Sequence, residues 1–167
     1  SNLLKTLKKN KITFFCGVPD SILKSLSIYL NAQNKKKHVI STNEGSAISL
    51  GIGYHLATNK IPCIYLQNSG LGNAINPLIS MAHKKVYSIP MLLMIGWRGS
   101  PKSKDEPQHM VKGQITPNVL KLLGIKYFIL KKNPDLKKLE KLISYSKNKN
   151  QPVACLIEKN VIKPIKS

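Results

Sequence analysis

Residues 61–83 read IPCIYLQNSGLGNAINPLISMAH, and this stretch decides the class of the fold. A short and continuously apolar run, Cys63–Leu66, passes through a glycine-rich turn into a longer segment whose apolar residues recur at helical spacing. Consecutive apolar residues are typical of a strand that is buried on both faces of a parallel sheet. The stretch therefore predicts a strand, a turn and a helix of an α/β domain.

The same alternation of short and long apolar segments extends over the whole chain. The runs that favour strands are Ile12–Val18, His38–Thr42, Ile61–Gln67, Pro90–Gly96, Lys126–Leu130 and Pro152–Glu158. The segments with helical spacing are Asp20–Asn31, Glu44–Thr58, Gly72–His83, Thr116–Leu123 and Pro134–Lys147. Strands that alternate with helices form right-handed βαβ units, so we expect an α/β fold: a parallel sheet of about six strands with helices on both faces.

The composition is that of a globular protein, with 42 % hydrophobic residues in 167. We assign residues 1–158 to one domain and 159–167 to a basic tail or linker. No apolar run is long enough to span a membrane, and the first residues do not resemble a signal peptide. The three cysteines lie far apart in apolar stretches, which excludes a disulfide framework and favours a reduced, cytoplasmic protein.

The charge of +20 raises the alternative of a lone basic module that binds nucleic acid or membrane. Only one of the 27 basic residues, Arg98, is an arginine, although arginine is the residue that DNA-binding proteins most often use to read bases. The lysines are spread along the whole chain and are not gathered in one segment. We therefore expect neither nucleic acid nor membrane as a partner.

Acidic residues are rare, and four of the seven follow predicted strands or lie in the long irregular stretch Trp97–Gly113. These four are Asp20, Glu44, Asp105 and Glu106. In open α/β sheets, ligands bind beyond the carboxyl ends of the strands, so these residues are candidates for a site. A structural role is the alternative, because Asp20 fits a helix cap and Glu44 fits a first-turn acid behind a Thr42 or Asn43 cap.

Three further features are predicted to lie at the same edge of the sheet. The turn Asn68–Asn73 is rich in glycine but matches no phosphate-binding motif. Arg98 can hold an anion with its guanidinium group, or it can brace the loop by pairing with Asp105 or Glu106. His109 is a candidate acid–base residue or a loop histidine with a structural role. No spacing of His, Cys, Asp or Glu predicts a metal site in this sequence.

Several motifs, taken together, resemble one enzyme family. FCGVPDS (Phe15–Ser21) followed by NEGSA (Asn43–Ala47) is similar to the pyrimidine-binding domain of thiamine-diphosphate-dependent decarboxylases. NSGLGNAINP (Asn68–Pro77) resembles the glycine-rich turn that opens the third helix of that domain. GWRG (Gly96–Gly99) and KDEPQH (Lys104–His109) resemble a loop of phosphonopyruvate decarboxylases, with the sulfopyruvate decarboxylase α-subunit as the near neighbour.

The resemblance extends from about Phe14 to Leu130 and implies roles for individual residues. In the family, a glutamate at the position of Glu44 hydrogen-bonds a ring nitrogen of the cofactor and shares a proton with it. Asp20 and His109 match positions whose side chains return a proton after CO₂ has left. The implied cofactor-binding residues are Glu44, Asn68, Ser69, Gly70 and Asn73, and the implied substrate-binding residues are Asp20, Arg98 and His109.

The implied reaction converts 3-phosphonopyruvate to phosphonoacetaldehyde and CO₂, with sulfopyruvate as the alternative substrate. The family holds the diphosphate of its cofactor through Mg²⁺ with a Gly-Asp-Gly…Asn motif of a second domain, and this sequence contains no Gly-Asp-Gly. We therefore expect half of an active site, either the α-subunit of a two-chain enzyme or the N-terminal domain of a longer chain.

An oligomer interface is expected around the helix that follows the glycine-rich turn. A helix that is apolar over much of its circumference is buried on more than one side, and its outer side marks a partner site. The apolar residues of this helix are Leu71, Ala74, Ile75, Leu78, Ile79 and Met81. We expect a second copy of the chain, a diphosphate-binding β-subunit or domain, or both, to cover them.

Overall fold

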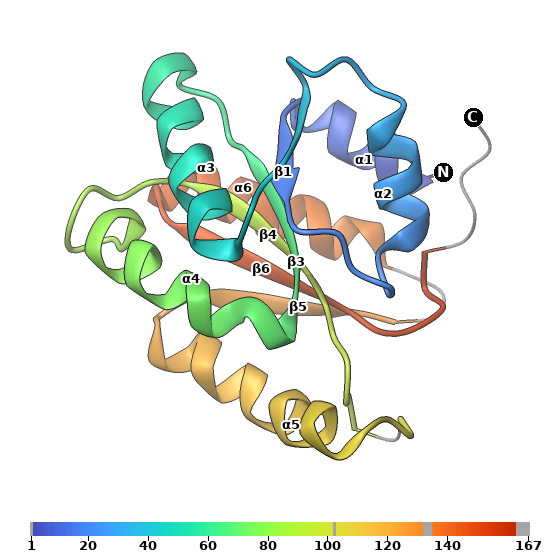
Figure 1. The fold of residues 1–167 in the computed structure, drawn as a ribbon. Helices are drawn as coiled ribbons and strands as arrows, with labels where there is room; N and C mark the ends of the chain where they lie inside the picture. The colour runs from blue at the N-terminus through green and yellow to red at the C-terminus, as the bar shows by residue number, and fades with distance from the viewer. Residues whose placement is uncertain (1, 102, 132–134, 163–167) are drawn as a thin grey trace.

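The computed structural model of the chain describes residues 2–101, 103–131 and 135–162, and it consists of one sheet between two layers of helices (Figure 1). The strands are β1 (Phe15–Gly17), β2 (His38–Ile40), β3 (Cys63–Gln67), β4 (Met91–Gly96), β5 (Lys126–Leu130) and β6 (Pro152–Ile157). Their order in the sheet is β2-β1-β3-β4-β6-β5, and all neighbouring strands are parallel. The predicted six-stranded parallel sheet is thereby confirmed.

The helices divide between the two faces of the sheet. The α-helices are α1 (Asn2–Lys9), α2 (Lys24–Asn31), α3 (Glu44–Thr58), α4 (Leu71–Pro77), α5 (Pro107–Leu122) and α6 (Leu136–Lys149). A 3₁₀ turn, η1 (Asn68–Gly70), precedes α4, and a π-helical turn, η2 (Leu78–Ala82), continues it. Leu66 and Ile95 point into a core under α3, α4 and α5, whereas Tyr65 and Met94 point into a second core under α1, α2 and α6. This alternation follows from the two-residue period of a strand, and it explains why the central strands are apolar at every position.

Helix α5 begins well before the expected segment Thr116–Leu123, so much of the stretch expected to be an irregular loop is helical. Pro107 stands at the first helical position, where its missing N–H is not needed. Pro117 lies inside the helix and cannot donate to the carbonyl of Gly113, four residues earlier. The indole N–H of Trp97 donates to that carbonyl over 2.9 Å, which compensates for the missing helical bond.

Helix α1 has no counterpart among the expected elements. Its leucines stand among lysines, and eight residues give little periodicity to recognise. Leu3, Leu4 and Leu7 are nevertheless buried in the second core, because three- and four-residue spacing places them on one side of the helix. The burial of this face stabilises a helix that would be too short to persist alone.

The chain after β6 stays packed on the domain as far as the structure describes it. Val161 and Ile162 pack against the second core. Residues 163–167, which complete the expected tail, lie outside the described residues. Among the helices of the described ranges, none combines the length and hydropathy needed to cross a lipid bilayer.

Candidate functional site

The order of the strands sets the order of the candidate residues along the carboxyl edge of the sheet. From the β2 side inward, they are Glu44 after β2, Asp20 after β1, Asn68–Gly70 after β3, Arg98 after β4 and Lys159 after β6. Carboxylates therefore follow the first two strands of this order, and cations follow two strands on the far side of β3. This edge is where an open parallel sheet binds its ligands.

Glu44 lies in the first turn of α3, and its carboxylate is held from two sides. Asn43 caps the helix, since its side chain accepts a hydrogen bond from the Ser46 amide at 2.8 Å. The Asn73 amide group donates to Glu44 Oε2 at 2.8 Å. Oε1 lies so close to Gly70 that a Cβ there would be 1.9 Å away, so any side chain at residue 70 would displace the carboxylate.

These contacts fit the cofactor whose binding the resemblance implies. The Glu44 side chain is half-buried at the carboxyl edge, and the space that its Oε1 occupies exists because Gly70 has no side chain. A carboxylate so placed can hydrogen-bond a ring nitrogen of thiamine diphosphate. Within the described residues, no three His, Cys, Asp or Glu side chains gather as metal ligands.

Asp20 is buried, and its carboxylate accepts three hydrogen bonds. It accepts hydrogen bonds from the backbone amides of Ile22 and Leu23, both at 3.2 Å, in the turn that leads to α2. Asp20 thus holds the turn before α2 and does not cap the helix, because the N-cap residue is Leu23 and no side chain bonds there. The side-chain amide of Gln67 also donates to Asp20, at 2.8 Å, and the Ser69 hydroxyl donates to Gln67 at 2.5 Å.

Gln67 was not among the candidates from the sequence, although it joins two of them. Its hydrogen bonds connect Asp20 after β1 with Ser69 after β3. The available signal is positional: Gln67 is the first polar residue after the apolar run of β3, at the edge where ligands bind.

Asn68 is buried, and its side chain ties the end of β3 to the residue after β4. Its Nδ2 donates to the carbonyl of Arg98 at 3.0 Å and to the hydroxyl of Thr116 at 3.1 Å. Its Oδ1 accepts from the Arg98 amide at 3.0 Å. Asn68 therefore contributes to the site by positioning Arg98 and the turn before α4.

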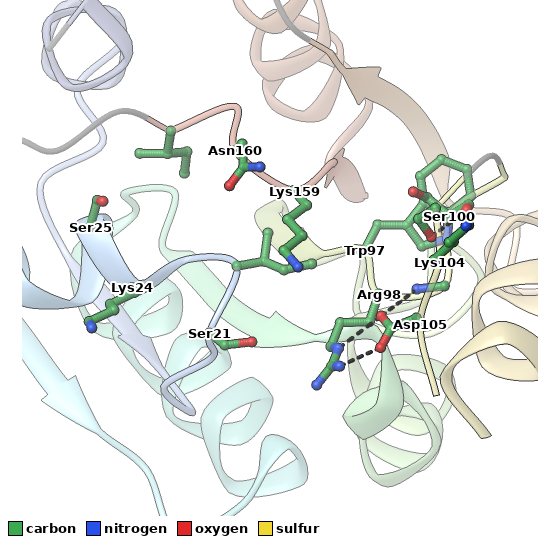
Figure 2. Close-up of a pocket in the computed structure, with 14 residues that line it drawn as sticks. Ser21, Lys24, Ser25, Trp97, Arg98, Ser100, Lys104, Asp105, Lys159 and Asn160 are labelled. Carbon is green, nitrogen blue, oxygen red and sulfur yellow. Dashed lines mark hydrogen bonds and ion pairs between the residues drawn. The ribbon is translucent and has the colours of Figure 1, made fainter. Parts of the chain in front are cut away.

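Arg98 forms the pair with Asp105 that was one of the two roles left open by the sequence (Figure 2). Its Nε donates to Asp105 Oδ2 at 3.0 Å, and its Nη2 donates to Oδ1. The amides of Gly99 and Glu106 donate to the same carboxylate at 3.2 and 3.0 Å. The hydrogen bonds from Arg98 hold the pKa of the Asp105 carboxyl well below its usual range.

His109 lies in the first turn of α5, and across the described ranges its side chain forms no hydrogen bond with the other candidates. Its ring is half-buried, and within the described residues Nδ1 is buried without a hydrogen-bond partner. Its backbone carbonyl packs tightly on Gly99, which brings α5 against the residue after Arg98. A ring nitrogen that is buried and unpaired among the residues described calls for a partner, and the role of His109 as an acid–base residue stays a prediction.

The comparisons with known proteins agree with this geometry. Residues 1–122 match the family model "Thiamine pyrophosphate enzyme, N-terminal TPP binding domain". The chain is 36 % identical over 155 residues to the sulfopyruvate decarboxylase subunit alpha of Methanococcus maripaludis, which covers 92 % of this chain and 90 % of that protein. It is 35 % identical over 135 residues to the phosphonopyruvate decarboxylase of Streptomyces hygroscopicus, which covers 81 % of this chain but 33 % of that protein.

A solved structure shows the same fold at lower identity. The match to benzoylformate decarboxylase from Polynucleobacter necessarius covers 99 % of this chain and 30 % of the decarboxylase chain, with a TM-score of 0.71 and 18 % identity. This chain thus spans about a third of the length of the phosphonopyruvate decarboxylase that it matches. Since the family model covers most of the residues, the chain belongs to the thiamine pyrophosphate enzymes, in which it corresponds to the N-terminal TPP binding domain.

Proposed function

We propose that the chain is the pyrimidine-binding half of a thiamine-diphosphate-dependent decarboxylase that converts 3-phosphonopyruvate and a proton to phosphonoacetaldehyde and CO₂. The observation that carries the proposal is the Glu44 carboxylate, held between Gly70 and the Asn73 amide at the carboxyl edge. Two relatives named phosphonopyruvate decarboxylase, at 35 and 36 % identity, support the substrate.

Thiamine diphosphate, when bound, supplies the electron sink for cleavage of the bond to CO₂. Glu44 would carry the shared proton at Oε1, because Oε2 already accepts a hydrogen bond from Asn73. Asp20 and His109 are proposed to supply the proton that replaces CO₂ on the substrate carbon. Ser69 and Gly70 would form the turn under the cofactor ring, and Asn68 would hold that turn in place.

The other half of the site is proposed to lie in a diphosphate-binding domain or subunit that holds Mg²⁺. Residues 1–158 would form the pyrimidine-binding domain, and 159–167 a connection or tail. Leu71, Ala74 and Leu78 are buried in the core of this chain, whereas Ile79 and Met81 are 47 and 38 % exposed. These exposed apolar side chains support a partner on the outer side of the helix, a second copy or the other subunit. The free, buried cysteines support a cytoplasmic location.

Sulfopyruvate is the second candidate substrate, and a specific observation favours it. The sulfopyruvate decarboxylase subunit alpha of Methanococcus maripaludis is 36 % identical over 155 residues, which is a longer match than that to either phosphonopyruvate decarboxylase. Sulfonate and phosphonate are both tetrahedral anions, and they differ mainly in charge. The family membership favours either enzyme over a lone basic module for nucleic acid or membrane.

The decisive experiment is decarboxylation by the chain mixed with a diphosphate-binding subunit, thiamine diphosphate and Mg²⁺, with each 2-keto acid in turn. We expect activity that the chain alone lacks, and we expect Glu44→Gln to abolish it without preventing assembly, because glutamine cannot take up the proton. Glu140→Gln, on the opposite layer, is the matched control and retains activity.

Four outcomes would count against the proposal. Robust decarboxylation by the 167-residue chain alone would refute the half-site, and full activity of Glu44→Gln would refute the role of that carboxylate. A large preference for sulfopyruvate would overturn the choice of substrate. Tight, steeply salt-dependent DNA or RNA binding, with no effect of thiamine diphosphate on the partnered chain, would favour the basic module.

A further inference from the structure

A cavity of about 430 Å³ opens at the end of the carboxyl edge where the cations lie (Figure 2). Its walls come from the residues that follow β1, the loop that follows β4 and the segment that follows β6. Three parts of the chain that are distant in sequence therefore surround one volume, next to the residues of the proposed active site.

The charges of the lining are unbalanced. The cations are Lys24, Arg98, Lys104 and Lys159, and the one carboxylate is that of Asp105. The number of lysines carries little weight in a chain with a charge of +20. Arg98 carries more, because it is the only arginine and its orientation is set by Asp105.

Within the part of the chain that the structure describes, the hydrogen bonds of Arg98 leave one side of its guanidinium group without a partner. Asp105 accepts from Nε and Nη2, so the Nη1 hydrogens remain to donate to another acceptor. A guanidinium group held in this way is suited to a tetrahedral oxyanion, since its donors need no further ordering when the anion binds.

Two further donors point toward Arg98 in the close-up view. The Lys159 side chain extends from the segment after β6 toward the guanidinium group, and the Ser21 hydroxyl points toward it from the segment after β1 (Figure 2). The Lys24 side chain also lines the cavity but points away from Arg98 in the same view. An ammonium group, a guanidinium group and a hydroxyl from three segments of the chain thus line one cavity.

We propose that this cavity binds the tetrahedral oxyanion at the end of the 2-keto acid, with Arg98, Lys159 and Ser21 as donors. The inference rests on the proposed function and names the part of the chain that would select the substrate. Ser21 directly follows Asp20, so the cavity begins beside the carboxylate proposed to return the proton. A 2-keto acid with an uncharged methyl group in place of the anion would leave these donors unpaired, which disfavours its binding.

The proposal also gives the segment after β6 a role in binding substrate. Lys159 is the first residue beyond the domain boundary that the sequence suggests, and it would belong to the substrate site. Asp105 acts through Arg98 and is a positioning residue, because its carboxylate faces the guanidinium group and two backbone amides.

The first test uses the complex of the chain with its diphosphate-binding partner and compares phosphonopyruvate, sulfopyruvate and pyruvate. We expect Lys159→Gln to raise KM for the anionic substrate about tenfold, with kcat little changed, and to leave kcat/KM for pyruvate as it is. Lys147 is an exposed lysine on α6, and Lys147→Gln is the matched control, which should change KM and kcat for neither substrate. The proposal would be overturned if Lys159→Gln lowered kcat/KM equally for the anionic substrate and for pyruvate, or if Lys159→Gln and Lys147→Gln had equal effects.

The second test needs no decarboxylation. Methylphosphonate and methanesulfonate are titrated into the chain, and ¹⁵N NMR shifts are followed at the Ser21 and Gly99 amides and at Arg98 Nε. We expect saturable shifts at these positions, weakened about tenfold by Lys159→Gln and unaffected by Lys147→Gln. Shifts spread over lysines of all elements would overturn the cavity as the site. The tighter of the two anions identifies the tail that the cavity prefers.

The two tests separate failure of the inference from failure of the proposed function. If the complex decarboxylates 2-keto acids but Lys159→Gln does not discriminate between charged and uncharged tails, the inference fails and the proposed function stands. If methylphosphonate binds at Arg98 but the complex decarboxylates none of the three acids, the proposed function fails, and the substrate role of the cavity fails with it.

Discussion

The indole N–H of Trp97 donates at 2.9 Å to the carbonyl of Gly113, the helical carbonyl that Pro117 leaves without its usual partner. Trp97 directly follows β4 and is buried, so this bond fastens the middle of α5 to the end of a central strand. The adjacent residue is Arg98. The hydrogen bond therefore also sets where the candidate substrate residues stand relative to the sheet.

We predict that Trp97→Phe destabilises the protein by about 1–3 kcal/mol through the unpaired buried carbonyl, in addition to the loss of apolar contact area. The measurement is the urea midpoint of unfolding. Pro117→Ala restores a backbone N–H to the helix and should recover part of the loss in the double variant. If the effects of the two substitutions on the free energy of unfolding are additive, the hydrogen bond from Trp97 does not compensate for Pro117.

Gly70→Ala should damage the site while preserving the fold. The backbone at Gly70 has φ −86°, which alanine adopts readily, but the new Cβ would meet Glu44 Oε1 at 1.9 Å. We expect the decarboxylation rate of the assembled enzyme to fall about a hundredfold, because the carboxylate is displaced from its position.

Gly72→Ala is the matched control for that variant, since a Cβ there meets nothing within 4 Å. Circular dichroism and the unfolding midpoint should stay near the parent values in both variants. Full activity of Gly70→Ala would show that the observed position of Glu44 is not the one that catalysis needs.

The buried pair of His38 and Tyr65 should make stability depend on pH. His38 Nε2 and Tyr65 Oη lie 2.8 Å apart, burial lowers the pKa of His38 below 6.5, and burial raises the pKa of Tyr65 to about 12. The unfolded chain then binds the histidine proton more readily than the folded chain. This contribution to stability is present above about pH 6.5 and is lost as the pH falls through the lower pKa of the folded state.

The check is the urea midpoint between pH 7.5 and pH 5. His38→Gln should flatten the dependence on pH, whereas His55→Gln, near the end of α3, should leave the slope close to that of the parent. If the urea midpoint of the parent does not change over this range, the pKa of His38 is not lowered by folding, and the prediction is wrong.

Asp105→Ala should loosen the loop that follows β4. The amides of Gly99 and Glu106 donate to this carboxylate, and so does the guanidinium group of Arg98. We expect hydrogen exchange at these two amides to become about tenfold faster. Asp135→Ala, which removes the cap of α6, should leave their exchange unchanged, and protection that survives in Asp105→Ala would contradict the bracing role.

The elements that could be predicted from the sequence are those whose own residues fit only one environment in a fold. The run Met91–Ile95 is apolar at every position, and such a segment fits only the middle of a covered sheet. The second part of α5 was expected at Thr116–Leu123, but its first part was not, because Pro117 suggests a break and the hydrogen bond from Trp97 that compensates for it forms only in the folded chain. Helix α1 had the correct spacing but too few residues to stand out.

The residues of the candidate site also divide into those that local sequence could place and those that it could not. Glu44 could be placed because a strand end, a cap and a first turn are local features. The pairing of Arg98 with Asp105 could not be decided from spacing, since Glu106 is equally near in sequence. Lys159 also follows a strand, but the lysines and proline after it in the sequence suggest a tail, so the proposed role became visible only in the structure.

The position of β5 has a consequence for synthesis of the chain. Within the described sheet β5 pairs only with β6, which is translated later and inserts between β4 and β5. The four strands from β1 to β4 can pair as they emerge from the ribosome, each beside a strand already made. Residues 126–130 must wait, with their backbone groups unpaired, until residues 152–157 appear. The last strand made is therefore the one that closes the sheet, and a pause in translation between β5 and β6 would leave an open strand edge exposed to other chains.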